Sequence, residues 1–162
     1  MAKTNEAGAY TLSLLRIGVG YIFLWAFIDK LFGLEFATCK GVKVGCSQAW
    51  IHGGSPTTGF LGHATSGPLA SFYHHLSGHA LVDWAFMLGL AFVGVGLLLG
   101  SWIRTAAAVA IAMLALMWSA LLWPANSPGV DEHVIYILVM LVFLFGNYPQ
   151  KWTVKLPWLK LP

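Results

Sequence analysis

Charged and titratable side chains flank the long apolar runs of the chain at three places. They are Asp29 and Lys30, then Asp83, and then the run Asp131, Glu132 and His133. Charges at membrane depth usually mark a site or a pairing, and a histidine can pass a proton near neutral pH. We therefore expect a polar vestibule in which His133, Asp131 and Asp83 are catalytic. Lys30, with Asp29 beside it, would bind an anionic substrate; a purely structural network of the same charges is an equally good alternative.

Several of these residues also have a structural interpretation. Asp131 and Asp83 are well placed to cap helices, and Trp84 fits a belt of interfacial aromatic residues, although we include it among the substrate-binding residues. Arg16 lies about 21 Å along a helix from Lys30, near the opposite membrane interface. There it either snorkels to water or faces the other helices and holds an anionic group or a partner subunit.

Cys39 and Cys46 close the short sequence CKGVKVGC. An even cysteine pair on the oxidising side of a membrane is most simply a disulfide, which we expect here. The functional alternative is a thiol pair that exchanges electrons or accepts a sulfur atom.

Five of the six histidines lie between residues 52 and 79. They are His52, His63, His74, His75 and His79. No HxxxH or CxxC pair stands out among them, because Gly78 interrupts the helical face that His75 and His79 would share. We therefore expect solvated or interfacial histidines and no metal site.

Four apolar stretches must position these residues. A helix rises 1.5 Å per residue, so about 20 apolar residues cross a hydrocarbon layer of roughly 30 Å. The uncharged runs 84–102 and 105–123 are nearly that long, whereas 17–28 and 134–145 are shorter. We predict an all-α integral membrane four-helix bundle in a single domain, 1–162. Its membrane helices would cover 11–34, 81–102, 105–123 and 132–147, with an outer loop at 35–80 and an interfacial tail at 148–162.

Composition and charge indicate the class of protein and its orientation in a membrane. The chain is 58% hydrophobic and only 9% charged, which leaves too little polar surface for a soluble domain. Its net charge of +3 includes no basic run, which argues against nucleic-acid binding. More lysines and arginines fall on the side of the termini than on the loop side. The positive-inside rule therefore favours the cell membrane with both termini cytoplasmic and the loop outside.

The outer loop carries two start signals for short helices. Ser55-Pro56 and Ser66-Gly67-Pro68 each place a proline near the first turn. Apolar residues follow both signals, so these helices would lie on the membrane surface or fold back over the bundle as a lid.

Four blocks of the chain resemble the DoxX/DoxD family of small four-helix membrane proteins. In order, they are LLRIGVGYIFLWAFIDKLFG, GGSPTTGFLGHATSGPLASFY, VDWAFMLGLAFVGVGLLLG and DEHVIYILV. The resemblance to the DoxD branch implies a thiosulfate:quinone oxidoreductase, which joins two thiosulfates into tetrathionate and passes the electrons to membrane quinone. It also implies that Arg16, the pair Asp29 and Lys30, Asp83 and the motif 131–133 are the family's polar residues.

The same resemblance implies a second subunit, because the DoxD enzyme is described as having two. The sequence itself has no CxxCH haem site, no Gly-rich dinucleotide fingerprint for a flavin and no cysteine set for an iron-sulfur cluster. Electrons would therefore pass directly to quinone or through a cofactor on a partner. The alternatives are a non-catalytic accessory subunit of a larger respiratory or redox complex, or a protein that binds or transports a small molecule or lipid. Each of these alternatives is compatible with a homo-oligomer of this chain.

Overall fold

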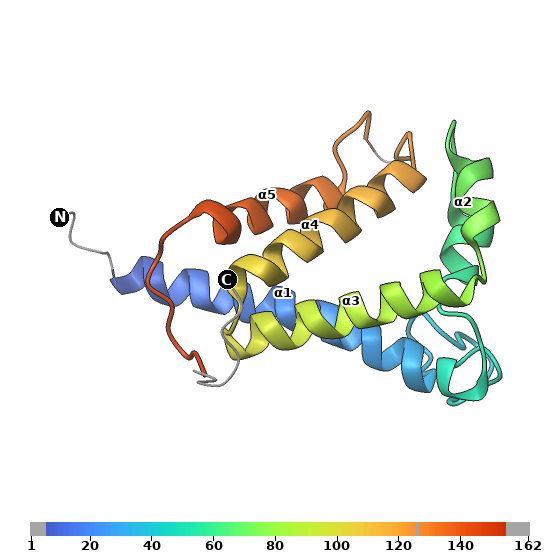
Figure 1. The fold of residues 1–162 in the computed structure, drawn as a ribbon, viewed down its shortest axis with the longest axis horizontal. Helices are drawn as coiled ribbons and strands as arrows, with labels where there is room; N and C mark the ends of the chain where they lie inside the picture. Colours follow the sequence, from blue (N-terminus) through green and yellow to red (C-terminus); the bar gives the residue numbers. More distant parts are fainter. Residues whose placement is uncertain (1–5, 126, 155–162) are drawn as a thin grey trace.

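The computed structural model describes residues 6–125 and 127–154, and these form helices and loops without strands (Figure 1). The elements are α1 (Glu6–Phe32), η1 (Trp50–His52), η2 (Phe60–Ala64), α2 (Ala70–Leu76), α3 (Ala80–Leu99), α4 (Ile103–Ala120) and α5 (Glu132–Phe145). The all-helical prediction is confirmed for this part of the chain. Helices α1, α3 and α4 are long and apolar enough to cross a membrane, which is consistent with a membrane protein.

All four expected membrane helices end earlier than predicted, at Phe32, Leu99, Ala120 and Phe145, and glycines explain two of these ends. Gly33 and Gly100 follow α1 and α3 with φ of 66° and 68°, a left-handed conformation that favours glycine and stops a helix. The expected ends at residues 34 and 102 were therefore too late. Helix α1 also begins at Glu6, before the expected start at residue 11, because Glu6 and the alanines after it are good helix formers.

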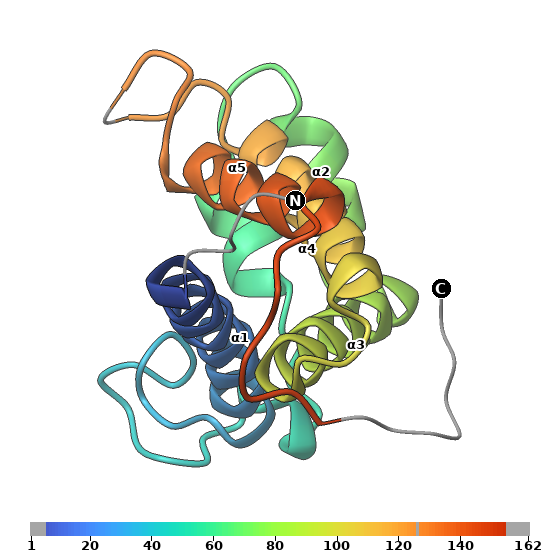
Figure 2. The same ribbon diagram turned by 90° about the vertical axis from the view of Figure 1, so that its left-hand side faces the viewer.

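The long helices follow one another around an arc, with α1 packed on α3, α3 on α4 and α4 on α5 (Figure 2). Close approach of α1 and α3 depends on two glycines. A Cβ at Gly20 would lie 2.9 Å from the backbone N of Leu98, and one at Gly94 would lie 2.6 Å from the backbone N of Leu24. Gly20 and Gly94 therefore let the backbones of α1 and α3 pack closely, as small residues do between membrane helices.

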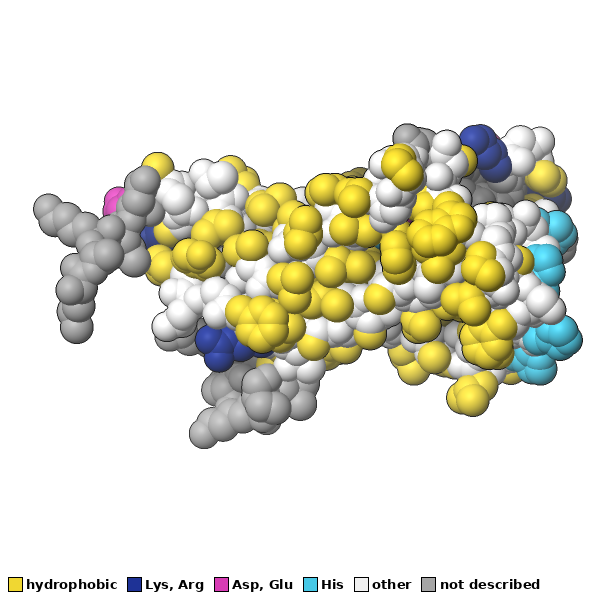
Figure 3. Space-filling model, turned by 90° about the horizontal axis from the view of Figure 1, so that it is seen from above, with side chains coloured by type: hydrophobic (Ala, Val, Ile, Leu, Met, Phe, Trp, Pro, Cys, Tyr) yellow, Lys and Arg dark blue, Asp and Glu magenta, His cyan; other side chains and the backbone are white. Residues whose placement is uncertain are grey.

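Helices α3 and α4 lie close together near their connection and diverge toward the outer loop, where α2 lies across the gap (Figure 1). The turn η2 and the helix α2 follow Ser55-Pro56 and Ser66-Gly67-Pro68, respectively. Apolar side chains cover much of the molecule along the helices, and histidines gather at the loop end (Figure 3). The helix α5 has only 14 residues, about 21 Å.

Candidate functional site

Lys30, in the last turn of α1, lines a cavity of about 550 Å³. The other lining residues come from the outer loop; those with polar side chains are Thr38, Ser47, Gln48, Ser55, Thr58 and His63. Lys30 is half-buried, and no described carboxylate forms an ion pair with it. The arrangement is a cation at the wall of a polar cavity, which is the chemistry that holds a small anion.

Asp29, the neighbour of Lys30, is fully engaged by the outer loop. Its carboxylate is 1% exposed and accepts hydrogen bonds from the backbone N–H groups of Phe36 at 3.2 Å, Ala37 at 3.0 Å and Thr38 at 2.9 Å. Both carboxylate oxygens take part. Asp29 therefore fixes the start of the loop, and the structure gives it no free oxygen with which to contact a substrate.

Asp83, in the first turn of α3, binds a different part of the same loop. Its Oδ1 accepts hydrogen bonds from Ser55 Oγ at 2.9 Å and from Thr57 Oγ1 at 2.5 Å. Thr57 Oγ1 in turn accepts one from the backbone N–H of Gly78 at 3.4 Å. Asp83 is buried and does not line the Lys30 cavity, but it positions Ser55, which does.

Asp131 caps α5, as the sequence predicts. Its Oδ1 accepts from the backbone N–H groups of His133 and Val134, and its Oδ2 lies 2.8 Å from His133 Nδ1. Burial raises the pKa of Asp131, but the hydrogen bonds from the His133 ring and from these N–H groups outweigh burial and leave the pKa below its ordinary value. The result is a buried carboxylate–imidazole pair at the start of α5.

The structure does not gather these groups into the single vestibule that we expected. His133 lies on α5 and Lys30 on α1, at the two ends of the arc of helices (Figure 2). No residue of α5 lines the Lys30 cavity. Charges that share one end of the membrane helices need not share a site, because the order of the helices around the arc separates them.

Arg16 and Trp84 are not among the residues that line the Lys30 cavity. The guanidinium of Arg16 is completely buried and donates hydrogen bonds to the backbone carbonyls of Leu97 and Leu98, at the end of α3, and to the segment 150–152. Trp84 is 55% exposed and packs edge-on against Trp50, with ring centroids 4.7 Å apart.

Cys39 and Cys46 are joined in a disulfide whose two residues are buried together with Ala49. The bridge packs against the end of α1, where a Cβ at Gly33 would lie 2.5 Å from Cys39 Sγ. Burial withholds the sulfur atoms from an attacking thiolate, so the geometry favours a structural bridge over an exchanging pair.

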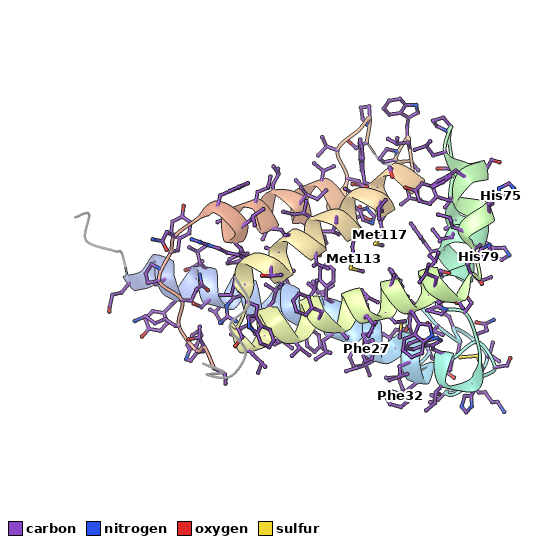
Figure 4. All side chains as sticks on the ribbon, viewed as in Figure 1. Phe27, Phe32, His75, His79, Met113 and Met117 are labelled. Carbon is purple, nitrogen blue, oxygen red and sulfur yellow. A yellow bond between two sulfur atoms is a disulfide. The ribbon has the colours of Figure 1, made fainter. Side chains whose placement is uncertain are left out.

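A second cavity of about 290 Å³ lies between α3, α4 and α2, and sequence reasoning missed it. Met113 and Met117 line it from α4, on the side that faces α3 (Figure 4). Pro56 and Phe60 line both cavities, and Phe86, which lines the second, has its ring centroid 5.9 Å from Lys30 Nζ. The polar and apolar cavities are therefore neighbours. The apolar cavity exists because α3 and α4 diverge, and no local sequence motif predicts that divergence.

The histidines of the outer loop do not assemble with other ligands. Within the described ranges, no three His, Cys, Asp or Glu side chains are grouped so as to hold a metal ion. His75 and His79 lie at the loop end of the molecule (Figure 4). Gly78, with a φ of 75°, separates the end of α2 from His79.

Comparison with known proteins adds no relative. No family model, no curated protein and no solved structure matches the chain. The fold and the cavities define an all-helical protein with three helices suited to a membrane, and the resemblance to the DoxX/DoxD family rests on the sequence motifs alone.

Proposed function

We propose that this chain is the membrane subunit of a quinone-linked oxidoreductase that acts on a small sulfur anion. The reaction is the one that the resemblance implies. Two thiosulfates form one sulfur–sulfur bond to give tetrathionate and release two electrons, and a membrane quinone takes up these electrons with two protons to become a quinol. The electrons pass directly between the two substrates or through a redox group on a partner subunit.

The observation that carries this proposal is the environment of Lys30. Lys30 is half-buried and lines a cavity with five hydroxyl or amide side chains, and it forms no ion pair with a described carboxylate. The carboxylate of Asp29 attracts its ammonium group only from beyond ion-pair distance. Hydrogen bonds between a cation and an anion are stronger than those between neutral groups. His63 lines the same cavity, and its Nδ1 donates to the carbonyl oxygen of Thr58 at 3.2 Å, so its Nε2 would donate to an anion when the ring is protonated. Thiosulfate is a compact dianion that fits this chemistry.

The membrane arrangement is part of the same proposal. Helices α1, α3, α4 and α5 would form a four-helix membrane unit in the cell membrane, with both termini cytoplasmic and residues 35–80 outside. The thiosulfate cavity would then open on the outer side. The short α5 would contact a second subunit or a second copy of the chain, which would complete the hydrocarbon-facing surface there.

A second candidate is a non-catalytic accessory subunit of a larger redox complex. One observation favours it: Arg16, Asp29, Asp83 and Asp131 all engage protein groups through hydrogen bonds. Of the polar residues that the resemblance implies, Lys30 alone combines a place at the polar cavity with the lack of an ion-pair partner in the described chain.

The experiment is quinone reduction on addition of thiosulfate to the natively purified chain, with whatever accompanies it, in mild detergent. Lys30→Met keeps an unbranched side chain, one atom shorter, and removes its charge, and we expect turnover to be lost. Lys43→Met removes an exposed lysine of the outer loop as a matched control and should leave turnover unchanged. An inert native preparation that copurifies with a multisubunit complex would establish the accessory role instead.

A further inference from the structure

The apolar cavity lies under α2, at the wide end of the gap between α3 and α4 (Figure 1). Its walls include Val82 and Phe86 from α3, Met113 and Met117 from α4, and Leu76 from α2. Its volume, about 290 Å³, is just below the range of about 300–1,000 Å³ that is usual for small-molecule sites. The two methionines give it a deformable wall, since Met side chains adapt to the shape of what they contact.

The protein itself satisfies the polar atoms at the cavity wall. Among the described lining side chains, only Thr57 and Tyr73 carry an oxygen. The Thr57 hydroxyl is bound to Asp83, and the Tyr73 hydroxyl lies 2.5 Å from Ser119 Oγ. A polar or charged molecule would give up its bonds to water there without replacement. The cavity therefore fits a hydrocarbon group.

The cavity reaches the outer surface of the helices. Phe72 and Leu116 line it, and each is 58% exposed. Because α3 and α4 are both candidate membrane spans, the surface around Leu116 would face lipid. The nearest source of hydrocarbon is therefore the bilayer.

Helix α2 covers the cavity and is held to α4 at two points. Ser119 Oγ lies 2.9 Å from the carbonyl oxygen of Leu116, to which it donates its only proton, so the Tyr73 hydroxyl must donate to Ser119. The backbone N–H of Ser66, before α2, donates to the carbonyl of Ala120 at 3.0 Å. The Tyr73–Ser119 hydrogen bond is the side-chain contact that holds α2 over the cavity.

We propose that this cavity is a binding site for a hydrocarbon chain taken from the bilayer and that α2 is its lid, fastened by the Tyr73–Ser119 hydrogen bond. The chain belongs either to a phospholipid or to a prenyl-substituted quinone, which share this chemistry. The site does not depend on the proposed reaction. If the reaction operates, the shared wall of Pro56 and Phe60 brings a quinone bound here next to the Lys30 cavity.

The test uses the full chain in nanodiscs of phosphatidylcholine and phosphatidylglycerol. One probe is a phosphatidylcholine with a photoreactive diazirine on its acyl chain, and the other is a benzoquinone with a diazirine on its prenyl chain. Crosslinked peptides are identified by mass spectrometry. Ala85→Trp fills the cavity from α3, and Ala112→Trp adds the same bulk at an exposed position of α4 outside the cavity.

We expect crosslinks at residues 72–76 and 113–117 that are lost in Ala85→Trp and retained in Ala112→Trp. Labelling by the lipid probe alone assigns the site to an acyl chain, and labelling by the quinone probe assigns it to a prenyl chain. Tyr73→Phe, which leaves the cavity unfilled, should release the probe about fivefold faster, as the loss of one hydrogen bond predicts. If Ala85→Trp leaves the labelling unchanged, the probe does not bind in this cavity. If Tyr73→Phe leaves the rate of probe release unchanged, the Tyr73–Ser119 hydrogen bond does not fasten α2 as a lid. The proposed function is tested separately, by measuring quinone reduction on addition of thiosulfate.

Discussion

Arg16 donates a hydrogen bond from its guanidinium to the backbone carbonyl of Lys151, 2.9 Å away and 135 positions later in the chain. Its Nε donates to Gln150 Oε1 at 3.1 Å, and its remaining contacts are to backbone carbonyls of α3 and of Trp152. Arg16 therefore clamps α1, the end of α3 and the segment after α5 together. A guanidinium suits this role because its donors form a fixed planar fork.

The clamp predicts that Arg16→Lys destabilises the protein. A lysine keeps the charge but cannot reproduce the fork, so buried carbonyls lose their partners at a cost of about 2 kcal/mol. We expect a lower thermal melting temperature in detergent and faster proteolysis between residues 146 and 154. Arg104→Lys, at an exposed position, is the control. Equal melting of the two variants would contradict the clamp.

Asp29 predicts a local effect on the outer loop. Asp29→Asn removes the charge that accepts three backbone hydrogen bonds, and such bonds contribute about 1.5–3 kcal/mol. We expect faster hydrogen exchange at the amides of residues 36–38. Glu35→Gln changes an exposed neighbouring acid and should leave exchange unaltered. Slow exchange in both variants would show that the loop holds without Asp29.

Asp83 can be tested as a positioning or a catalytic residue. Thr57→Val keeps the shape of Thr57 and removes the hydroxyl that donates to Asp83. If Asp83 acts by holding the loop, Thr57→Val and Asp83→Asn should lower thiosulfate turnover to a similar degree, mainly through a higher KM. A large loss of kcat in Asp83→Asn, without one in Thr57→Val, would instead support a catalytic role for Asp83.

Asp131 predicts a pH dependence of stability. Its pKa is lower in the folded protein, so its contribution is complete above its ordinary pKa, about 3.9, and is lost as the pH falls through the lowered value. The melting temperature of the native protein should therefore fall more steeply below about pH 4 than that of Asp131→Asn. Glu132→Gln, at an exposed position beside it, should keep the native profile. Parallel profiles for all three would mean that the Asp131–His133 pair contributes nothing measurable.

Removing the disulfide tests whether it stabilises the fold or takes part in the reaction. Replacing Cys39 and Cys46 together by serine should lower the melting temperature, because the bridge constrains the loop in the unfolded chain. Turnover per folded molecule should persist at a temperature where the variant is folded. Its disappearance there would favour the alternative, a thiol pair that exchanges electrons or sulfur.

The sequence predicted what depends on local pattern. Long uncharged runs are enough to place α3 and α4, because backbone hydrogen bonding in a membrane leaves helices as the simple solution. The cap at Asp131 was predictable from the turn before it, since its partners lie two and three residues away.

What the sequence did not predict depends on distant pairing. The grouping of Lys30 with His133 was inferred from their shared end of the membrane, but the arc of helices separates them. The partners of Arg16 lie more than 80 positions away, so no spacing rule could find them. Residues 148–154 of the expected interfacial tail return to the helices at Arg16 and Ser13, and residues 155–162 of that tail lie outside the described residues.

The clamp at Arg16 also orders the biogenesis of the chain. Ribosomes make proteins from the N-terminus, so α1 leaves with its guanidinium long before residues 97 and 150–152 exist. That charge is costly to bury until its acceptors arrive. The clamp therefore closes last, and a nascent chain halted after α5 would still lack the acceptors at residues 150–152 that complete the hydrogen bonding of Arg16.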